Sequence, residues 1–164
     1  AIEEENELIY VFTKANADIG GAFINQVLQE FCEIHENCYL FDSLGSRKYL
    51  SMLAGCKVAI GNSSSGIYEA PAFRIPTINI GNRQNGRVKA KSIVDCKPNK
   101  EEIVKAIKMV QSNSFTKKLK NMKIPFEGGK TAEKILEKIV QVVENKINLQ
   151  KGFYDIYFKT DIEK

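Results

Sequence analysis

The sequence lacks the features that would place it in a specialised class of protein. Its 164 residues contain no Trp, one His and only four Pro. No apolar run approaches the roughly 20 residues of a membrane span, and no basic-then-apolar signal peptide opens the chain. Compositions typical of collagen, disordered chains and disulfide scaffolds are also excluded. We therefore expect a cytoplasmic protein without a membrane partner, folded as one domain over residues 1–164.

Cysteine spacing gives little support for a metal site or for disulfides. Four cysteines stand at positions 32, 38, 56 and 96, with no C-x-x-C among them. The single His35 cannot complete a zinc site with them at a familiar spacing. We expect free thiols in a reducing compartment and no bound metal.

Charge is divided unevenly along the chain. Residues 1–82 carry 5 basic and 10 acidic groups, whereas residues 83–164 carry 19 basic and 10 acidic groups. Most lysines of the basic half alternate with glutamates at helical spacing, as Lys134 and Lys138 do, which is typical of a solvated helix face. Aromatic residues do not interleave with these cations, as they do in grooves that bind single-stranded nucleic acid. Nucleic acid is therefore not the expected partner.

Short β-branched runs alternate with segments of helical periodicity. The pattern predicts strands at residues 8–13, 38–41, 57–60, 76–80 and 93–94, and helices at residues 18–36, 45–55, 67–70, 99–110, 115–121 and 131–146. The inward faces of the first and last helices should be apolar, with Phe23, Val27 and Ile34 on the first. The tail at 148–164 has no clear periodicity. This order predicts an α/β fold, with a Rossmann-like parallel sheet sandwiched by helices.

Ligands of open α/β sheets bind beyond the carboxyl ends of the strands, and one such loop is rich in small residues. It reads Gly61-Asn62-Ser63-Ser64-Ser65-Gly66 and lies between a strand and a short helix. Open N–H groups at a helix start bind phosphate readily, and serine hydroxyls add donors. The loop matches neither a Walker A motif nor G-x-G-x-x-G. Ordinary helix capping by Ser63 or Ser64 remains the alternative.

Two further features could complete a nucleotide site. Glu69 can reach ribose hydroxyls over the same helix start, unless it merely stabilises the helix dipole. Arg83 and Arg87 lie in a glycine-bounded loop after the next strand, and the planar guanidinium suits phosphate, although surface arginines are common. Because both loops follow neighbouring strands, they should face one crevice that fits a diphosphate. No catalytic triad or acid/base pair is visible.

The segments from Val58 to Phe73 and from Pro76 to Arg87 resemble the nucleotide-binding region of UDP-N-acetylglucosamine 2-epimerases. The similarity is greatest to the hydrolysing branch, which makes N-acetylmannosamine for sialic-acid-type sugars. Further segments agree in order, namely residues 13–18, 41–45, 126–129 and 152–156. The sequence departs from the family pattern in one segment and at one further residue: Glu127-Gly128-Gly129 replaces Gly-Asp-Gly, and Arg74 stands where a small residue is usual.

The resemblance implies half of a glycosyltransferase-B-like fold, in which two Rossmann-like domains enclose the active site. This chain matches the C-terminal domain, so the N-terminal catalytic domain lies outside it. The family pattern implies a UDP site built from eight residues, which are Leu44 at the uracil, Ser63, Ser64, Ser65 and Gly66 at the diphosphate, Glu69 at the ribose, Arg83 at the diphosphate and Arg87 as a helper.

The family's reaction eliminates UDP across C1 and C2 of the sugar and then adds water, which inverts C2. The resemblance places the acid/base carboxylates in the missing domain and implies no cofactor. We therefore expect no catalytic residue in this fragment and no turnover by it alone. The expected partners are UDP or UDP-N-acetylglucosamine, the N-terminal domain and a second copy in a homodimer. A non-hydrolysing epimerase and a non-catalytic nucleotide-binding module are the alternatives.

Overall fold

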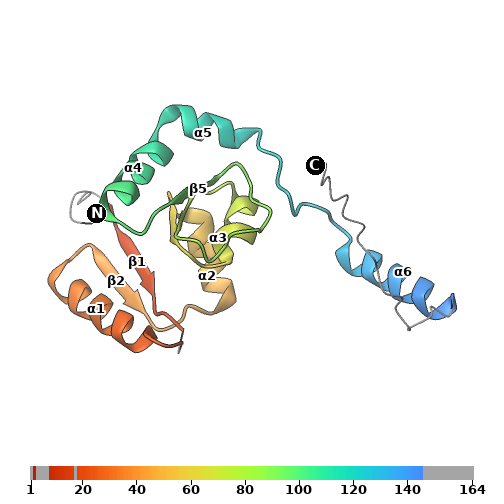
Figure 1. Ribbon diagram of the computed structural model, residues 1–164, viewed down its shortest axis with the longest axis horizontal. Helices are drawn as coiled ribbons and strands as arrows, with labels where there is room; N and C mark the ends of the chain where they lie inside the picture. The colour runs from red at the N-terminus through yellow and green to blue at the C-terminus, as the bar shows by residue number, and fades with distance from the viewer. Residues whose placement is uncertain (1, 3–7, 17, 146–164) are drawn as a thin grey trace, which may run out of the picture. The chain divides into compact units, whose positions relative to one another are not determined.

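The computed structural model describes residues 2, 8–16 and 18–145 (Figure 1). It divides into two compact units, Ala1–Glu127 and Gly128–Lys164, and each is described by itself. The predicted single domain over 1–164 stays a prediction. The irregular tail at 148–164 and the family-like segment at 152–156 lie outside the described residues.

The first unit alternates strands and helices in the predicted order (Figure 1). Its strands are β1 (Tyr10–Thr13), β2 (Cys38–Phe41), β3 (Ala59–Gly61), β4 (Thr77–Ile80) and β5 (Ile93–Cys96). Its helices are α1 (Gly21–Ile34), α2 (Gly45–Gly55), α3 (Ser65–Tyr68), α4 (Lys100–Gln111) and α5 (Asn113–Lys120), with a 3-10 turn, η2, at Ala70–Phe73. The helix predicted at 67–70 is thus divided, because Pro71 has no N–H to continue α3.

All strand pairs are parallel, as predicted for alternating strands and helices. Tyr10 of β1 stands opposite Cys38 of β2, and β4 lies between β3 and β5. Within the described part of the chain, β1–β2 and β3–β4–β5 form two separate sheets rather than one. The carboxyl ends of β3 and β4 lie at one edge, where the two candidate loops begin.

The core of the first unit lies between the second sheet and α4. Ile78 of β4 is fully buried and packs with Cys96, Ala106, Ile107 and Val110. Burial of each large aliphatic side chain contributes about 1.5–3 kcal/mol, so this cluster anchors β4. Successive strand residues point to opposite faces, so Thr77 and Asn79 lie on the other side of β4, where both are also buried. A second cluster contains Ala90, Leu119, Met122 and Ile124.

The predicted inward face of the first helix is only partly correct. Leu28 and Phe31 are half-buried, but Phe23 and Ile34 are 71% and 77% exposed, and Val27 is exposed as well. For Phe23 and Ile34, which lie near the two ends of α1, the reason is the length of the helix relative to the strands beside it. A helix of 14 residues extends about 21 Å, whereas strands of four residues extend about 13 Å, so the β1–β2 sheet cannot cover the whole helix.

The second unit contains α6 (Thr131–Glu144), which confirms the predicted last helix. Its apolar side chains, among them Ile135, Leu136 and Ile139, are exposed. Lys134 Nζ donates to the Gly128 carbonyl oxygen at 3.2 Å. Across the described parts of both units, no helix is long and apolar enough to cross a membrane.

Candidate functional site

The serine turn, residues 61–66, begins where β3 ends. Gly61 has a φ of +145°, which side-chain-bearing residues rarely adopt, so the sharp exit from the strand requires glycine. Ser63 then closes the turn: its carbonyl oxygen accepts from Gly66 N at 3.2 Å, and its Oγ accepts from Ser65 N at 3.3 Å. Ser64 directly precedes α3 and makes no side-chain cap bond.

The turn leaves donors available to an anion. No hydrogen bond from the backbone N–H of Ser63 or Ser64 is found among the described residues. Both side chains are exposed. Because α3 has only four residues, its dipole is small, and local N–H and hydroxyl groups would contribute most of the attraction. The turn can therefore hold a phosphate group by direct hydrogen bonds.

Two contacts hold the serine turn in place, one with α2 and one with β4. The Ser65 hydroxyl and the Tyr49 hydroxyl of α2 lie 2.6 Å apart, which ties the turn to the neighbouring helix. Gly66 lies so close to β4 that a Cβ placed on it would stand 2.7 Å from Thr77 Cγ2. A hydrogen at Gly66 is thus what allows α3 to pack directly on the strand.

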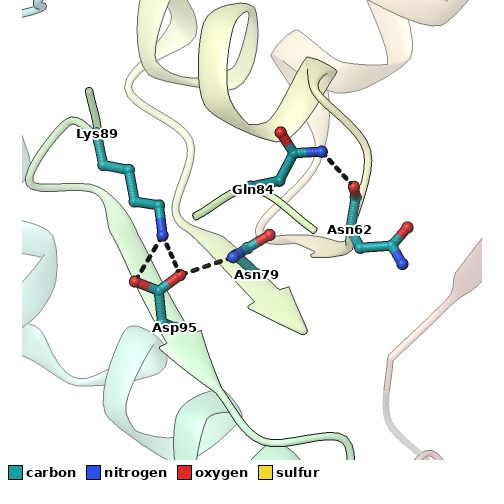
Figure 2. A network of polar contacts seen from close by, with 5 residues as sticks. All are labelled: Asn62, Asn79, Gln84, Lys89 and Asp95. Atoms are coloured by element: carbon teal, nitrogen blue, oxygen red, sulfur yellow. Dashed lines mark hydrogen bonds and ion pairs between the residues drawn. The ribbon is translucent and has the colours of Figure 1, made fainter. Parts of the chain in front are cut away.

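The loop that follows β4, residues 81–92, meets the serine turn at Asn62. Gln84 Nε2 donates to the Asn62 carbonyl oxygen at 2.7 Å (Figure 2). Arg83 Nη1 lies 3.5 Å from the same oxygen. The structure therefore brings the two predicted loops together at the carboxyl edge of β3 and β4. Whether Ser63, Ser64 and Arg83 bind a nucleotide there stays a prediction.

Arg87 has a different neighbour. Its guanidinium carbon lies 5.4 Å from the centre of the Tyr68 ring, a cation–π contact at an exposed site. Tyr68 in turn packs against Phe126, with ring centres 4.8 Å apart. Arg87 is thus held beside α3, the helix that directly follows the serine turn. Its predicted role as a helper at the diphosphate stays a prediction.

The two remaining predicted residues stand alone. Glu69 directly follows α3 with an exposed side chain, and in the described chain its carboxylate has no hydrogen bond or ion pair. Leu44 is half-buried and directly precedes α2. Neither is joined to the turn by a recorded contact, so their roles at ribose and uracil also stay predictions.

Sequence reasoning did not identify the polar network that anchors the far end of the 81–92 loop. Lys89 Nζ lies 2.7 and 2.9 Å from the two carboxylate oxygens of Asp95, and buried Asn79 donates to Asp95 Oδ1 at 2.6 Å (Figure 2). Partial burial alone would raise the pKa of Asp95. The hydrogen bonds from Lys89 and Asn79 and the Lys89 charge outweigh it, so the pKa lies below its ordinary value. In the sequence, Asp95 is marked only by its place directly after the strand predicted at residues 93–94.

Arg74, which departs from the family pattern, has a structural role away from the serine turn. It adopts a left-handed backbone with a φ of 58°, and its Nη1 donates to the carbonyl oxygens of Leu119, Lys120 and Met122 at 2.9–3.2 Å. A cation there interacts favourably with the carboxyl end of α5. The departure therefore stabilises the α5 end.

A cavity of about 540 Å³ lies beside Arg74, and it is not the predicted crevice. It is lined by Val58 and Pro76, which precede β3 and β4, whereas the serine turn follows β3. In the described chain, no group of His, Cys, Asp and Glu could hold a metal ion. All four cysteines are free, and burial is the largest cause that raises the pKa of each thiol.

Comparisons with known proteins show the family to which the chain belongs. The profile of a family described as UDP-N-acetylglucosamine 2-epimerase matches residues 1–140. A Campylobacter jejuni protein named GDP/UDP-N,N'-diacetylbacillosamine 2-epimerase (hydrolyzing) is 44% identical over 147 residues, which is 89% of this chain and 38% of the relative. The Escherichia coli polysialic acid biosynthesis protein P7 is 34% identical over 147 residues, which is 90% of this chain and 37% of the relative.

A solved structure shares the fold. It is the UDP-GlcNAc 2-epimerase of Methanocaldococcus jannaschii in complex with UDP-GlcNAc and UDP, with a TM-score of 0.67 and 20% identity. The match covers 85% of this chain and 37% of that one. The predicted fold class is thereby confirmed. The chain spans less than two fifths of the length of each of these three relatives.

Proposed function

Because the chain belongs to the UDP-N-acetylglucosamine 2-epimerase family, we propose that it is the nucleotide-sugar-binding half of a hydrolysing UDP-N-acetylglucosamine 2-epimerase. The parent enzyme would convert UDP-N-acetylglucosamine and water to N-acetylmannosamine and UDP, for sialic or other nonulosonic acid synthesis. One observation carries the proposal. The Asn62 carbonyl oxygen joins the serine turn to the 81–92 loop, which we call the arginine loop. The unpaired backbone N–H groups of the turn and the Arg83 guanidinium therefore lie at the same edge of the sheet.

The task of this half is to stabilise the leaving diphosphate. When the C2 proton is removed and the C1–O bond breaks, negative charge accumulates on UDP. Preorganised N–H groups at Ser63 and Ser64 and the Arg83 guanidinium would stabilise that charge. Glu69 would accept hydrogen bonds from the ribose, and Leu44 would contact the uracil. Water then adds its hydroxyl to C1 and a proton returns to the opposite face of C2, steps that need acid/base groups outside this chain.

Calorimetric titration of UDP into the chain tests the proposal. Arg83→Ala should weaken UDP binding about tenfold or more, because a hydrogen bond to a charged group contributes about 1.5–3 kcal/mol and 1.4 kcal/mol is tenfold. Uridine should bind equally to both proteins. Lys108→Ala is the matched control, since Lys108 is an exposed cation of α4 without a recorded contact in the described chain. A folded chain that binds neither UDP nor GDP would contradict the proposal.

A second substrate is favoured by the Campylobacter relative, whose name specifies GDP/UDP-N,N'-diacetylbacillosamine. The same reaction on such a 2-acetamido sugar would use the same diphosphate site. Parallel titrations with UDP and GDP decide between the nucleotides. The alternative of a non-hydrolysing epimerase is less well supported, because the Campylobacter relative, which is 44% identical, is named as hydrolyzing.

The partners follow from the same proposal. An N-terminal domain of a longer protein would supply the catalytic groups, and a homodimer stays a prediction. A cytoplasmic location is supported by the four free thiols, which suit a reducing compartment.

A further inference from the structure

We propose that Gln84 is a positioning residue, which holds Arg83 beside the diphosphate site through its bond to the serine turn. The inference rests on the proposed function, because it assigns a task to Gln84 within the same site. Gln84 is 2% exposed, although Arg83 and Asn85 on either side of it are exposed. A long polar side chain buried in a polar loop requires an explanation.

The bond that Gln84 makes is well placed to align the two loops. Its Nε2 donates over 2.7 Å to the carbonyl of Asn62, which stands between Gly61 and the serines. Arg83 is the preceding residue, so the backbone from which its side chain extends is fixed within one residue of this bond. The Arg83 guanidinium itself lies 3.5 Å from the same oxygen, at the outer limit of a hydrogen bond. It is therefore held nearby and can still turn toward an anion.

The other end of the Gln84 amide shows that stability alone does not account for the residue. Its Oε1 is buried and has no hydrogen-bond partner within the described residues. A buried acceptor without a donor destabilises a fold, and an apolar side chain of similar length would avoid that loss. Polar groups that lower stability in this way are typical of functional sites. The Nε2 bond to the serine turn is the part of Gln84 that an apolar residue cannot replace.

The far end of the loop has an independent anchor, so Gln84 acts on a segment that is already restrained. Lys89 is paired with Asp95, which also accepts from Asn79 of β4 (Figure 2). Loss of the Gln84 bond would therefore release the part of the loop around Arg83 without releasing Lys89. That makes the effect local and measurable.

The first test measures the UDP dissociation constants of the unaltered chain, Gln84→Met, Arg83→Ala and the double variant. Gln84→Met should weaken UDP binding about fivefold or more, since misplacement of a charged group by about 1 Å is costly. In the Arg83→Ala background the same change should have less than a twofold effect, and uridine binding should not change in either. The thermal midpoint of Gln84→Met should equal or exceed that of the unaltered chain. An equal loss in both backgrounds, or a loss that follows a lowered midpoint, would overturn the inference.

The second test needs no nucleotide. Trypsin cleavage after Arg83 and Arg87 under native conditions should be several-fold faster in Gln84→Met. Gln84→Asn keeps the amide, but its shorter side chain cannot reach the Asn62 carbonyl oxygen. We therefore expect it to be cleaved as fast as Gln84→Met. If the unaltered chain bound no UDP while both variants opened the loop, the proposed function would fail and the anchoring role of Gln84 would stand. Unchanged cleavage in both variants would overturn that role whatever the UDP result.

Discussion

The close packing of Gly66 on Thr77 gives a sharp prediction about stability. In Gly66→Ala the added Cβ would lie 2.7 Å from Thr77 Cγ2, well inside the 3.5–4.0 Å at which carbon atoms normally meet. Thr77 is 3% exposed within the central strand, and its β-branched side chain has little freedom to turn away. Overpacking of this kind costs about 1–3 kcal/mol.

The higher helix propensity of alanine opposes this loss of stability, and its contribution is smaller. Alanine is favoured over glycine inside a helix by about 1 kcal/mol, and Gly66 lies within α3 with an ordinary negative φ. The net effect of Gly66→Ala should therefore be a decrease of about 1 kcal/mol in the free energy of unfolding, and at most about 2 kcal/mol.

The matched background is Thr77→Ser, which removes only Cγ2. The next atoms of Thr77, Oγ1 and Cβ, lie 3.8 and 3.9 Å from the added carbon, which is ordinary contact. Thr77→Ser alone should cost about 1 kcal/mol for the lost methyl group. In that background Gly66→Ala should be neutral or stabilising, so the sign of its effect reverses. Urea denaturation of all four proteins measures this coupling, and an equal loss in both backgrounds would refute the packing argument.

Three further predictions concern other described contacts. Arg74→Ala should lower the free energy of unfolding by about 1–3 kcal/mol, because it removes the hydrogen bonds to three carbonyl groups. Arg74→Gly should lower it less, because glycine relieves about 1 kcal/mol of strain in the left-handed backbone. Equal losses of both variants in urea denaturation would contradict this. Asn99→Ala should cost about 0.5–2 kcal/mol, because Asn99 Oδ1 accepts from Glu102 N at 2.9 Å, whereas Asn99→Asp should retain most of it. Since the native pKa of Asp95 lies below its ordinary value of 3.8, its stabilising effect is complete above that pH and is lost as pH falls through the native value. Asp95→Asn should therefore show a smaller loss of stability in acid-titrated urea denaturation, and an unchanged acid profile would argue against the network.

The element order could be read from the sequence because its signals are local. Short β-branched runs between turn residues predicted every strand of the second sheet to within about three residues. The start of the helix predicted at 99–110 is also fixed locally, because the Asn99 side chain accepts a hydrogen bond from Glu102 N three residues later. The division of the helix around Pro71 was harder, because a proline within a helical pattern can kink a helix or end it.

What the sequence could not show depends on contacts between distant segments. Nothing distinguishes Gln84 from its polar neighbours until the loop is folded against Asn62. Arg74 could be recognised as unusual, but its purpose lies at the end of α5, about 45 residues away. The exposure of Phe23 and Ile34 follows from the short strands beside α1, which no helical periodicity reveals. The loops of the candidate site were predictable, whereas the contacts that hold them were not.

The most direct test of the account is to follow the backbone amide resonances of the chain while UDP is added. The largest shifts should occur at Ser63 and Ser64, with further shifts at Arg83 and Gly86, because the diphosphate is placed between the serine turn and the arginine loop. Arg83→Ala should reduce them. Shifts centred instead on Val58 and Leu119, which line the cavity beside Arg74, would contradict the central claim.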